Sequence, residues 1–378
     1  MAGLQEMQSG PSMLLISLLY RIISAELLFG NNTMKQPDKI LIVRNDKLGD
    51  FMLIWPAVSL LKKQFPQATI IALVNRYTEP MASLCPWIDD VIMDVTEGSG
   101  FFRSLKLSAL IRDSDIDISI SFFSTMHTAL AIWLAGVSVR IAPATKLAQI
   151  FYNRRLRQKR SRSEKPEYLY NIDLVEYLVS VMGRPALPVD KPPYLKFEAE
   201  DSEAIRRQFK KDNGISEQAK LVFLHPGSGG SAPALNQRQF AALIDRLSVR
   251  QDWFFVITAG PGELELATRV AELAETDNKT VYESTSGLNE FSLFLSIADL
   301  FFSGSTGVLH IAGALDVPTV AFYTRRQSAT SLRWQTLNST DRRLSFSPPM
   351  TADAEDMQSI DVDVVAHEVL ASRLVAAI

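Results

Sequence analysis

The stretch KILIVRNDKLGDFMLIWPAVSLLKKQF, residues 39–65, combines a run of β-branched side chains, a turn and an apolar segment. We interpret KILIVRN as a buried strand, Gly49 and Asp50 as the close of the turn, and residues 51–65 as a helix. A continuous apolar strand followed at once by a helix is typical of a parallel sheet covered on both faces. The stretch therefore predicts the first unit of an α/β fold.

The same alternation continues along most of the chain. Further strands are expected at residues 68–75, 89–94, 116–122, 219–227, 253–260, 280–284, 300–304 and 318–323. Helical stretches separate them, and residues 362–378 predict a terminal helix. Strands that alternate with helices indicate βαβ units, so we predict two Rossmann-like, doubly wound parallel-sheet domains.

A proline-rich stretch divides the two halves. GRPALPVDKPPY, Gly183–Tyr194, holds four prolines in twelve residues, a density that neither a helix nor a central strand tolerates. Two such halves joined by a linker make a cleft, where open α/β sheets bind ligands. We expect an N-terminal extension, a first domain, a linker, a second domain and a C-terminal helix at residues 1–34, 35–183, 184–195, 196–350 and 351–378.

Composition narrows the class of protein. The 378 residues are 47% hydrophobic and 21% charged with a formal net charge of −3, which is ordinary for a globular protein and indicates no nucleic-acid partner. The single cysteine, Cys85, cannot form an internal disulfide. No cluster of His, Cys and Asp has metal-ligand spacing, so we expect neither metal nor cofactor. A reducing cytoplasm is the default compartment.

Two segments are candidates for contact with a membrane. Residues 11–30 are mostly apolar but carry Arg21 and Glu26, so an amphipathic helix is favoured over a spanning one. That helix would pack on the protein itself or lie in a membrane interface. Residues 154–165 are rich in Lys and Arg. They would form a solvated loop or contact a phosphorylated lipid or sugar.

The turn RNDKLGD, residues 44–50, places a carboxylate at a helix start beside the predicted cleft. Asp50 there would be a helix cap or a general base that deprotonates a sugar hydroxyl. Arg44 and Lys47 in the same turn are candidate phosphate or acceptor contacts.

Three glycine-containing turns follow strands of the second half. HPGSGGS (225–231) and SGSTGVLH (303–310) offer backbone amides to anions, the second at a helix N-terminus that would stabilise a diphosphate. In GPGELELA (260–267), Glu263 would hold the two hydroxyls of a ribose or merely begin a helix. The donor-binding candidates are Ser228, Glu263, Ser305, Thr306, Gly307, Val308 and His310, the last of which would otherwise be a packing residue.

These motifs, in this order, resemble the lipopolysaccharide heptosyltransferases of glycosyltransferase family nine. RNDKLGDFMLIWPAV resembles that family's opening segment, and HPGSGGSA, GPGELELA and ADLFFSGSTGVLHIAGALDVPTVAFY resemble its second-domain segments. The resemblance covers residues 39 to about 335, and its last segment is the most specific.

The resemblance implies a GT-B fold and a metal-independent, inverting glycosyltransferase. ADP-heptose would bind mainly to the second domain and a lipid A–Kdo lipopolysaccharide core mainly to the first, with Asp50 as the base. It implies that Glu263 holds the ribose, that Thr306, Gly307 and Val308 hold the diphosphate, and that His310 lies nearby. Such an enzyme would be cytoplasmic, with attachment to the inner face of the inner membrane as an open alternative.

The chain departs from the family at two places. Ser305-Thr306-Gly307 stands where many members have Asp-Thr-Gly, and the second departure lies near Pro233. Pro233 stands near a lysine that many members carry as a phosphate partner, and Arg238 is a candidate substitute. Two other classes therefore stay open: a non-catalytic sugar-nucleotide-binding protein, and a GT-B epimerase or transferase that uses a UDP-sugar.

Overall fold

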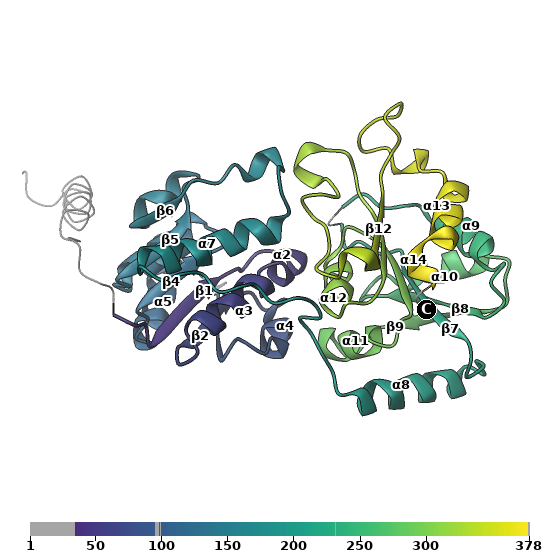
Figure 1. Ribbon diagram of the computed structural model, residues 1–378, viewed down its shortest axis with the longest axis horizontal. Coiled ribbons are helices and arrows are strands. Elements are labelled where there is room, and N and C mark those ends of the chain that lie inside the picture. The colour runs from purple at the N-terminus through teal and green to yellow at the C-terminus, as the bar shows by residue number, and fades with distance from the viewer. Residues whose placement is uncertain (1–34, 95–97, 99, 231, 377–378) are drawn as a thin grey trace, which may run out of the picture.

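The computed structural model describes residues 35–94, 98, 100–230 and 232–376. The expected amphipathic helix at residues 11–30 lies outside them. The described chain forms two parallel sheets side by side (Figure 1), each with six strands. No helix in the described ranges is both long and apolar enough to cross a membrane.

The first sheet has the order β3-β2-β1-β4-β5-β6. Its strands are β1 (Lys39–Val43), β2 (Thr69–Val74), β3 (Asp90–Met93), β4 (Ile118–Ser121), β5 (Val139–Pro143) and β6 (Arg154–Leu156). Its helices are α2 (Leu48–Met52), α3 (Trp55–Gln64), α4 (Glu79–Leu84), α5 (Gly100–Asp113), α6 (Met126–Leu134) and α7 (Glu167–Val181), with short 3₁₀ turns η1 (Leu147–Phe151) and η2 (Arg160–Arg162).

The second sheet has the order β12-β11-β10-β7-β8-β9. Its strands are β7 (Lys220–His225), β8 (Trp253–Ala259), β9 (Lys279–Glu283), β10 (Leu300–Gly304), β11 (Thr319–Phe322) and β12 (Arg343–Phe346). Its helices are α8 (Ala199–Asp212), α9 (Gln237–Leu247), α10 (Leu264–Leu273), α11 (Leu288–Leu295), α12 (Gly307–Ala314), α13 (Val362–Ala371) and α14 (Arg373–Ala376), with 3₁₀ turns η3 (Gln327–Ala329), η4 (Thr340–Arg342) and η5 (Met357–Ser359).

Helices cover both faces of each sheet, as the apolar strands predicted. In β1, Ile40 and Ile42 pack on one face with residues of α3 and α7, whereas Leu41 and Val43 pack on the other with α5 and α6. Successive side chains of a strand point to opposite faces, so a strand buried on both faces is apolar at most positions rather than at alternate ones. The α/β fold class predicted from the sequence is confirmed.

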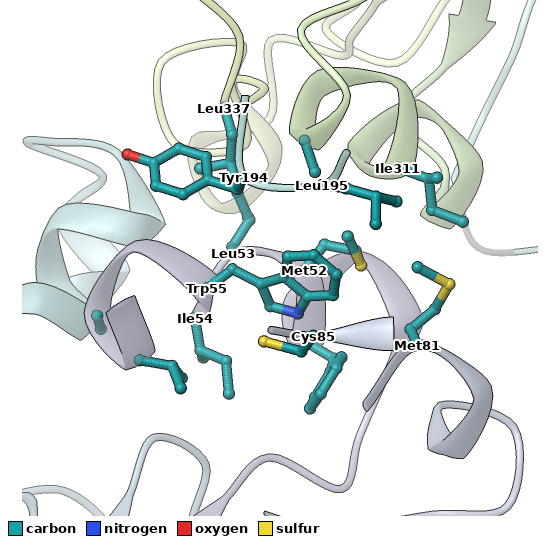
Figure 2. Packing of buried hydrophobic residues seen from close by; sticks show 14 of the residues in the cluster. Met52, Leu53, Ile54, Trp55, Met81, Cys85, Tyr194, Leu195, Ile311 and Leu337 are labelled. Atoms are coloured by element: carbon teal, nitrogen blue, oxygen red, sulfur yellow. The ribbon is translucent and has the colours of Figure 1, made fainter. Parts of the chain in front are cut away.

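One apolar cluster joins the two halves. Figure 2 shows Met52, Trp55 and Met81 of the first half facing Leu195 and Ile311 across the junction. The linker helps to hold them together. Near its end the amides of Tyr194 and Leu195 both donate to the carbonyl of Ala314, at 2.7 and 3.0 Å.

The structure corrects two predicted helices. The helix expected at residues 51–65 is two helices, because Pro56, the second residue of α3, has no N–H to continue a helix from α2. The expected terminal helix is likewise divided, because Ser372 is extended between α13 and α14.

The basic segment 154–165 is exposed at several of its cations, as the solvated-loop interpretation expected, but it is not a loop throughout. It contains β6 and η2, and Arg160 Nη1 lies 2.6 Å from Glu167 Oε1. Lys165 Nζ lies 2.6 Å from Asp173 Oδ2. The partners of these cations are carboxylates of α7, a helix that the sequence analysis did not find.

Candidate functional site

A cavity of about 960 Å³ lies between the two halves. The turn between β1 and α2 lines it from the first half, and the loops after β7, β8 and β10 line it from the second. All four lie at the carboxyl ends of parallel strands, the edge where open α/β sheets bind ligands.

Asp50 lies in the first turn of α2 and lines the cavity. Burial raises the pKa of the Asp50 carboxyl, whereas the Arg44 guanidinium, which donates a hydrogen bond to this carboxyl, lowers that pKa. The carboxylates of Asp46 and Glu167 raise it, and the pKa of Asp50 is about 6. A carboxylate with a pKa near neutrality is ionised at pH 7 yet basic enough to accept a proton from a reacting hydroxyl. The geometry therefore fits a general base.

Arg44 does not face the cavity but lies buried beneath Asp50. Its Nε is 2.8 Å from Asp46 Oδ1, and its Nη1 is 3.6 Å from Glu167 Oε1. Burial alone would lower the pKa of Arg44, but the carboxylates of Asp50, Asp46 and Glu167 outweigh it and raise that pKa. Arg44 is therefore a charged support for Asp50.

Glu167 connects this support to the second half. Its Oε2 lies 3.3 Å from Nη2 of Arg333, and its backbone amide donates to the Arg333 carbonyl at 2.8 Å. Glu167 is almost fully buried, and a buried carboxylate is stable only when cations compensate it. The charge around Asp50 thus depends on a residue of the opposite half.

The opposite wall of the cavity is the N-terminus of α12. Thr306 is its N-cap, and the Thr306 side chain accepts from the amide of Leu309. The Thr306 amide donates to the Gly304 carbonyl at 2.8 Å, so this amide is not free for a ligand, contrary to the prediction from the sequence. The first-turn amides of Gly307 and Val308 have no carbonyl within the helix to donate to, and both residues line the cavity. An anion fits there.

Glu263 supports the loop after β7. Its carboxylate accepts from the amides of Gly229 and Gly260, at 3.0 and 3.1 Å. A Cβ on Gly227 would lie 2.1 Å from Glu263 Oε2, so only glycine allows this approach. Burial lowers the pKa of neighbouring His225, whose Nε2 lies 3.5 Å from Glu263, although Glu263 opposes the shift. Glu263 lines the cavity, with capacity left to accept from ligand hydroxyls.

His310 packs between the halves. It is buried, and burial lowers its pKa to about 4, so the imidazole is neutral. A Cβ on Gly49 would lie 2.6 Å from His310 Cδ2, and one on Gly307 would lie 2.7 Å from Leu48 Cδ2. Two glycines thus let α2 and α12 approach closely. His310 also lines the cavity, and its Nδ1 has no hydrogen-bond partner among the described residues.

The cations on the cavity wall differ from those expected. Lys47 lines the cavity, but Arg238 is exposed on α9 and is not among the described residues of the lining. Arg76 and Arg326 line it instead, in the loops after β2 and β11. Both follow predicted strands, so the rule that ligands bind at carboxyl ends could have found them. Ser228 and Ser305 line the cavity too.

No three His, Cys, Asp or Glu side chains in the described part of the chain gather into a group that could hold a metal ion. Two Rossmann-like halves that face each other across a cleft have the arrangement of the GT-B fold, here with a carboxylate on one wall of the cleft and a helix N-terminus on the other.

Residues 104–353 match the family described as Glycosyltransferase family 9 (heptosyltransferase). A Haemophilus influenzae protein, provisionally named a glycosyltransferase, is 42% identical over 334 residues, 88% of this chain and 96% of its own. Lipopolysaccharide heptosyltransferase 3 of Escherichia coli is 24% identical over 73% of this chain and 79% of its own. The structure of E. coli ADP-heptose LPS heptosyltransferase II is similar with a TM-score of 0.72 and 17% identity, over 90% of this chain and 99% of that one. The chain belongs to glycosyltransferase family 9.

Proposed function

We propose that this enzyme transfers a heptose from ADP-heptose to a lipopolysaccharide core acceptor, with inversion at the anomeric carbon. The observation that carries the proposal is that the Asp50 carboxylate and the N-terminus of α12 line one cavity from opposite halves. The names of the relatives supply the donor and acceptor classes.

In the proposed reaction, an acceptor hydroxyl oxygen forms a bond to the anomeric carbon of heptose while the bond from that carbon to the phosphate oxygen breaks. Asp50 takes the hydroxyl proton. ADP leaves with the electron pair of the broken bond, and the amides of Gly307 and Val308 stabilise its charge. The base and the anion site thus act on opposite sides of one reacting carbon.

We further propose that Arg326 and Lys47 supply the positive charge that the family lysine supplies elsewhere. Both line the cavity, whereas Arg238 does not. Arg326 Nη1 lies 3.6 Å from Glu355 Oε1 on an exposed surface, a weak contact that a diphosphate would replace at little cost. Glu263 would accept from the ribose hydroxyls. In this scheme residues 35–183 bind the acceptor and residues 196–350 the donor, in the cytoplasm at the inner membrane.

The test is transfer of heptose from ADP-heptose to a truncated lipopolysaccharide, followed by ADP release and product mass. Asp50→Asn should lower turnover by about 100- to 10,000-fold. It should leave the ADP dissociation constant within about twofold, measured by calorimetry. Competition by UDP as strong as that by ADP would redirect the proposal to a UDP-sugar enzyme. ADP-heptose binding without turnover in the unsubstituted chain would instead favour a non-catalytic binding protein, which the missing lysine at Pro233 suggests.

A further inference from the structure

Large apolar side chains are exposed on one side of the first half. Phe102 in the first turn of α5 is 72% exposed and Leu147 at the start of η1 is 76% exposed. Five more belong to the same elements: Phe101, Leu105 and Leu110 of α5, Met126 of α6 and Ile150 of η1. Exposed apolar side chains that gather in one place mark an interaction surface.

These three elements lie next to one another. Ser104 Oγ of α5 is 3.0 Å from His127 Nδ1 of α6, which brings the first turns of the two helices together. The rings of Trp133 in α6 and Phe151 in η1 are 5.8 Å apart. We call these seven exposed apolar residues and their three elements the α5–α6–η1 surface.

The charge of this surface is positive. Arg103 and Lys106 lie between the apolar residues of α5, and Lys146 directly precedes η1. The only acidic residue within α5, α6 and η1 is Asp113, at the far end of α5. Asp94, which faces α5 and α6, is nearly buried and contacts Arg103 and His127, each at 3.0 Å. Phenylalanine and leucine interspersed with Lys and Arg are typical of segments that lie in the interface of an anionic bilayer.

The surface adjoins the first wall of the cavity. Asn45 Nδ2, next to the cavity residue Asp46, donates to Asp94 Oδ2 at 2.7 Å. On the other side, Lys146 Nζ and the Arg44 guanidinium lie over the same Phe123 ring, at 5.4 and 5.9 Å. A bilayer held against this surface would therefore present a lipid-anchored acceptor near Asp50.

We propose that the α5–α6–η1 surface docks onto an anionic lipid bilayer, with Phe101, Phe102 and Leu147 inserted among the headgroups and Lys146 on the phosphates. This rests on the proposed function, in which the acceptor is a membrane lipid. It commits to lipid rather than to a protein partner because the exposed phenylalanine and leucine side chains share this surface with Lys and Arg, and because the surface adjoins the cavity wall near Asp50.

A site-specific probe tests it in the full-length chain. Cys85 is the only cysteine and is buried, so Phe102→Cys can be labelled alone with an environment-sensitive fluorophore. Vesicles of phosphatidylethanolamine and phosphatidylglycerol should shift its emission to the blue. The matched control is Met350→Cys, 83% exposed in the second half, which should not respond. No shift at residue 102, or equal shifts at both positions, would overturn the proposal.

Vesicle flotation gives a second measurement. The double variant F101S/F102S should lower the fraction bound to these vesicles by about tenfold or more, because the two aromatic side chains that insert into the bilayer are lost. The control double variant V249S/M350S should bind as the parent does. Loss of binding in the Leu18→Asp variant with full binding by F101S/F102S would assign the membrane contact to residues 11–30 and refute this surface. Binding that survives in vesicles without anionic lipid would also refute it.

An acceptor without lipid separates this proposal from the proposed function. F101S/F102S should retain kcat/KM toward a deacylated core oligosaccharide but lose about tenfold toward acceptor in vesicles. Equal loss toward both acceptors would mean a folding or active-site defect and would contradict docking. If the unsubstituted chain transferred heptose to neither acceptor, the proposed function would be wrong. The fluorescence measurement would then be the test of the α5–α6–η1 surface.

Discussion

Asp46→Asn is expected to move the acid limb of the pH–rate profile to lower pH. Asp46 and Asp50 bind the same Arg44 guanidinium, and the charge of Asp46 raises the pKa of Asp50. Asparagine keeps an oxygen that accepts from Arg44 Nε, so the turn should keep its shape. The substitution thus removes one negative charge and little else.

The magnitude follows from Coulomb's law. Carboxylates that share one guanidinium are roughly 5–7 Å apart, and at an effective dielectric constant of about 40 their repulsion is roughly 1.2–1.7 kcal/mol, or about one pKa unit. Arg44 lies between them and neutralises part of that field, so we expect the pKa of Asp50 to fall from about 6 by about half to one unit.

The direction in which activity changes with pH follows from the role of Asp50 as a base. Only the ionised carboxylate accepts a proton, so activity is lost as the pH falls through the pKa of Asp50. At pH 5 the ionised share should rise from about one tenth to between about a quarter and a half. Relative to the plateau, kcat/KM at pH 5 should therefore rise about three- to fivefold, while the plateau falls modestly because the base is weaker.

The assay measures ADP release from ADP-heptose in the presence of a core acceptor. We would determine kcat/KM from about pH 4.5 to about pH 8. The matched control is Asp252→Asn in the second half, where Arg250 Nε and Asp252 Oδ1 are 3.0 Å apart in the same Arg-x-Asp spacing. It should leave the acid limb in place. A limb that stays put or moves to higher pH in Asp46→Asn would refute the assignment of Asp50 as a base whose pKa is set by burial and charge.

Three further substitutions test the packing and the donor site. Gly49→Ala puts a Cβ against the buried His310 ring and should lower kcat/KM about 10- to 100-fold by separating the halves; an unchanged rate would contradict that packing. Gly227→Ala displaces Glu263 and should raise the ADP dissociation constant in calorimetry about tenfold, whereas unchanged affinity would remove Glu263 from the donor site. Arg326→Gln should weaken ADP about five- to tenfold and adenosine hardly at all, and equal losses for both would exclude a diphosphate contact.

Much of the fold could be predicted because its signals are local. The apolar runs at residues 39–43 and 300–304 are strands buried on both faces, and such strands are apolar at most positions. Two of the missed elements carry weaker patterns. β6 is a three-residue edge strand with two arginines, and α8 is a charged surface helix with one buried residue. For these, neighbours in space outweigh local preference.

The sequence by itself determined two parallel-sheet halves and the turns at their carboxyl edges, since periodicity and glycine placement act within a few residues. It therefore located the turn of Asp50 and the α12 N-terminus. Only the tertiary structure decided which charges surround that carboxylate: Arg333, far along the chain, compensates Glu167, which in turn contacts Arg44. It likewise put Arg326 rather than Arg238 on the cavity wall. The electrostatic environment of a buried charge depends on the charged groups that the fold packs against it, and no local sequence pattern encodes the distances to those groups.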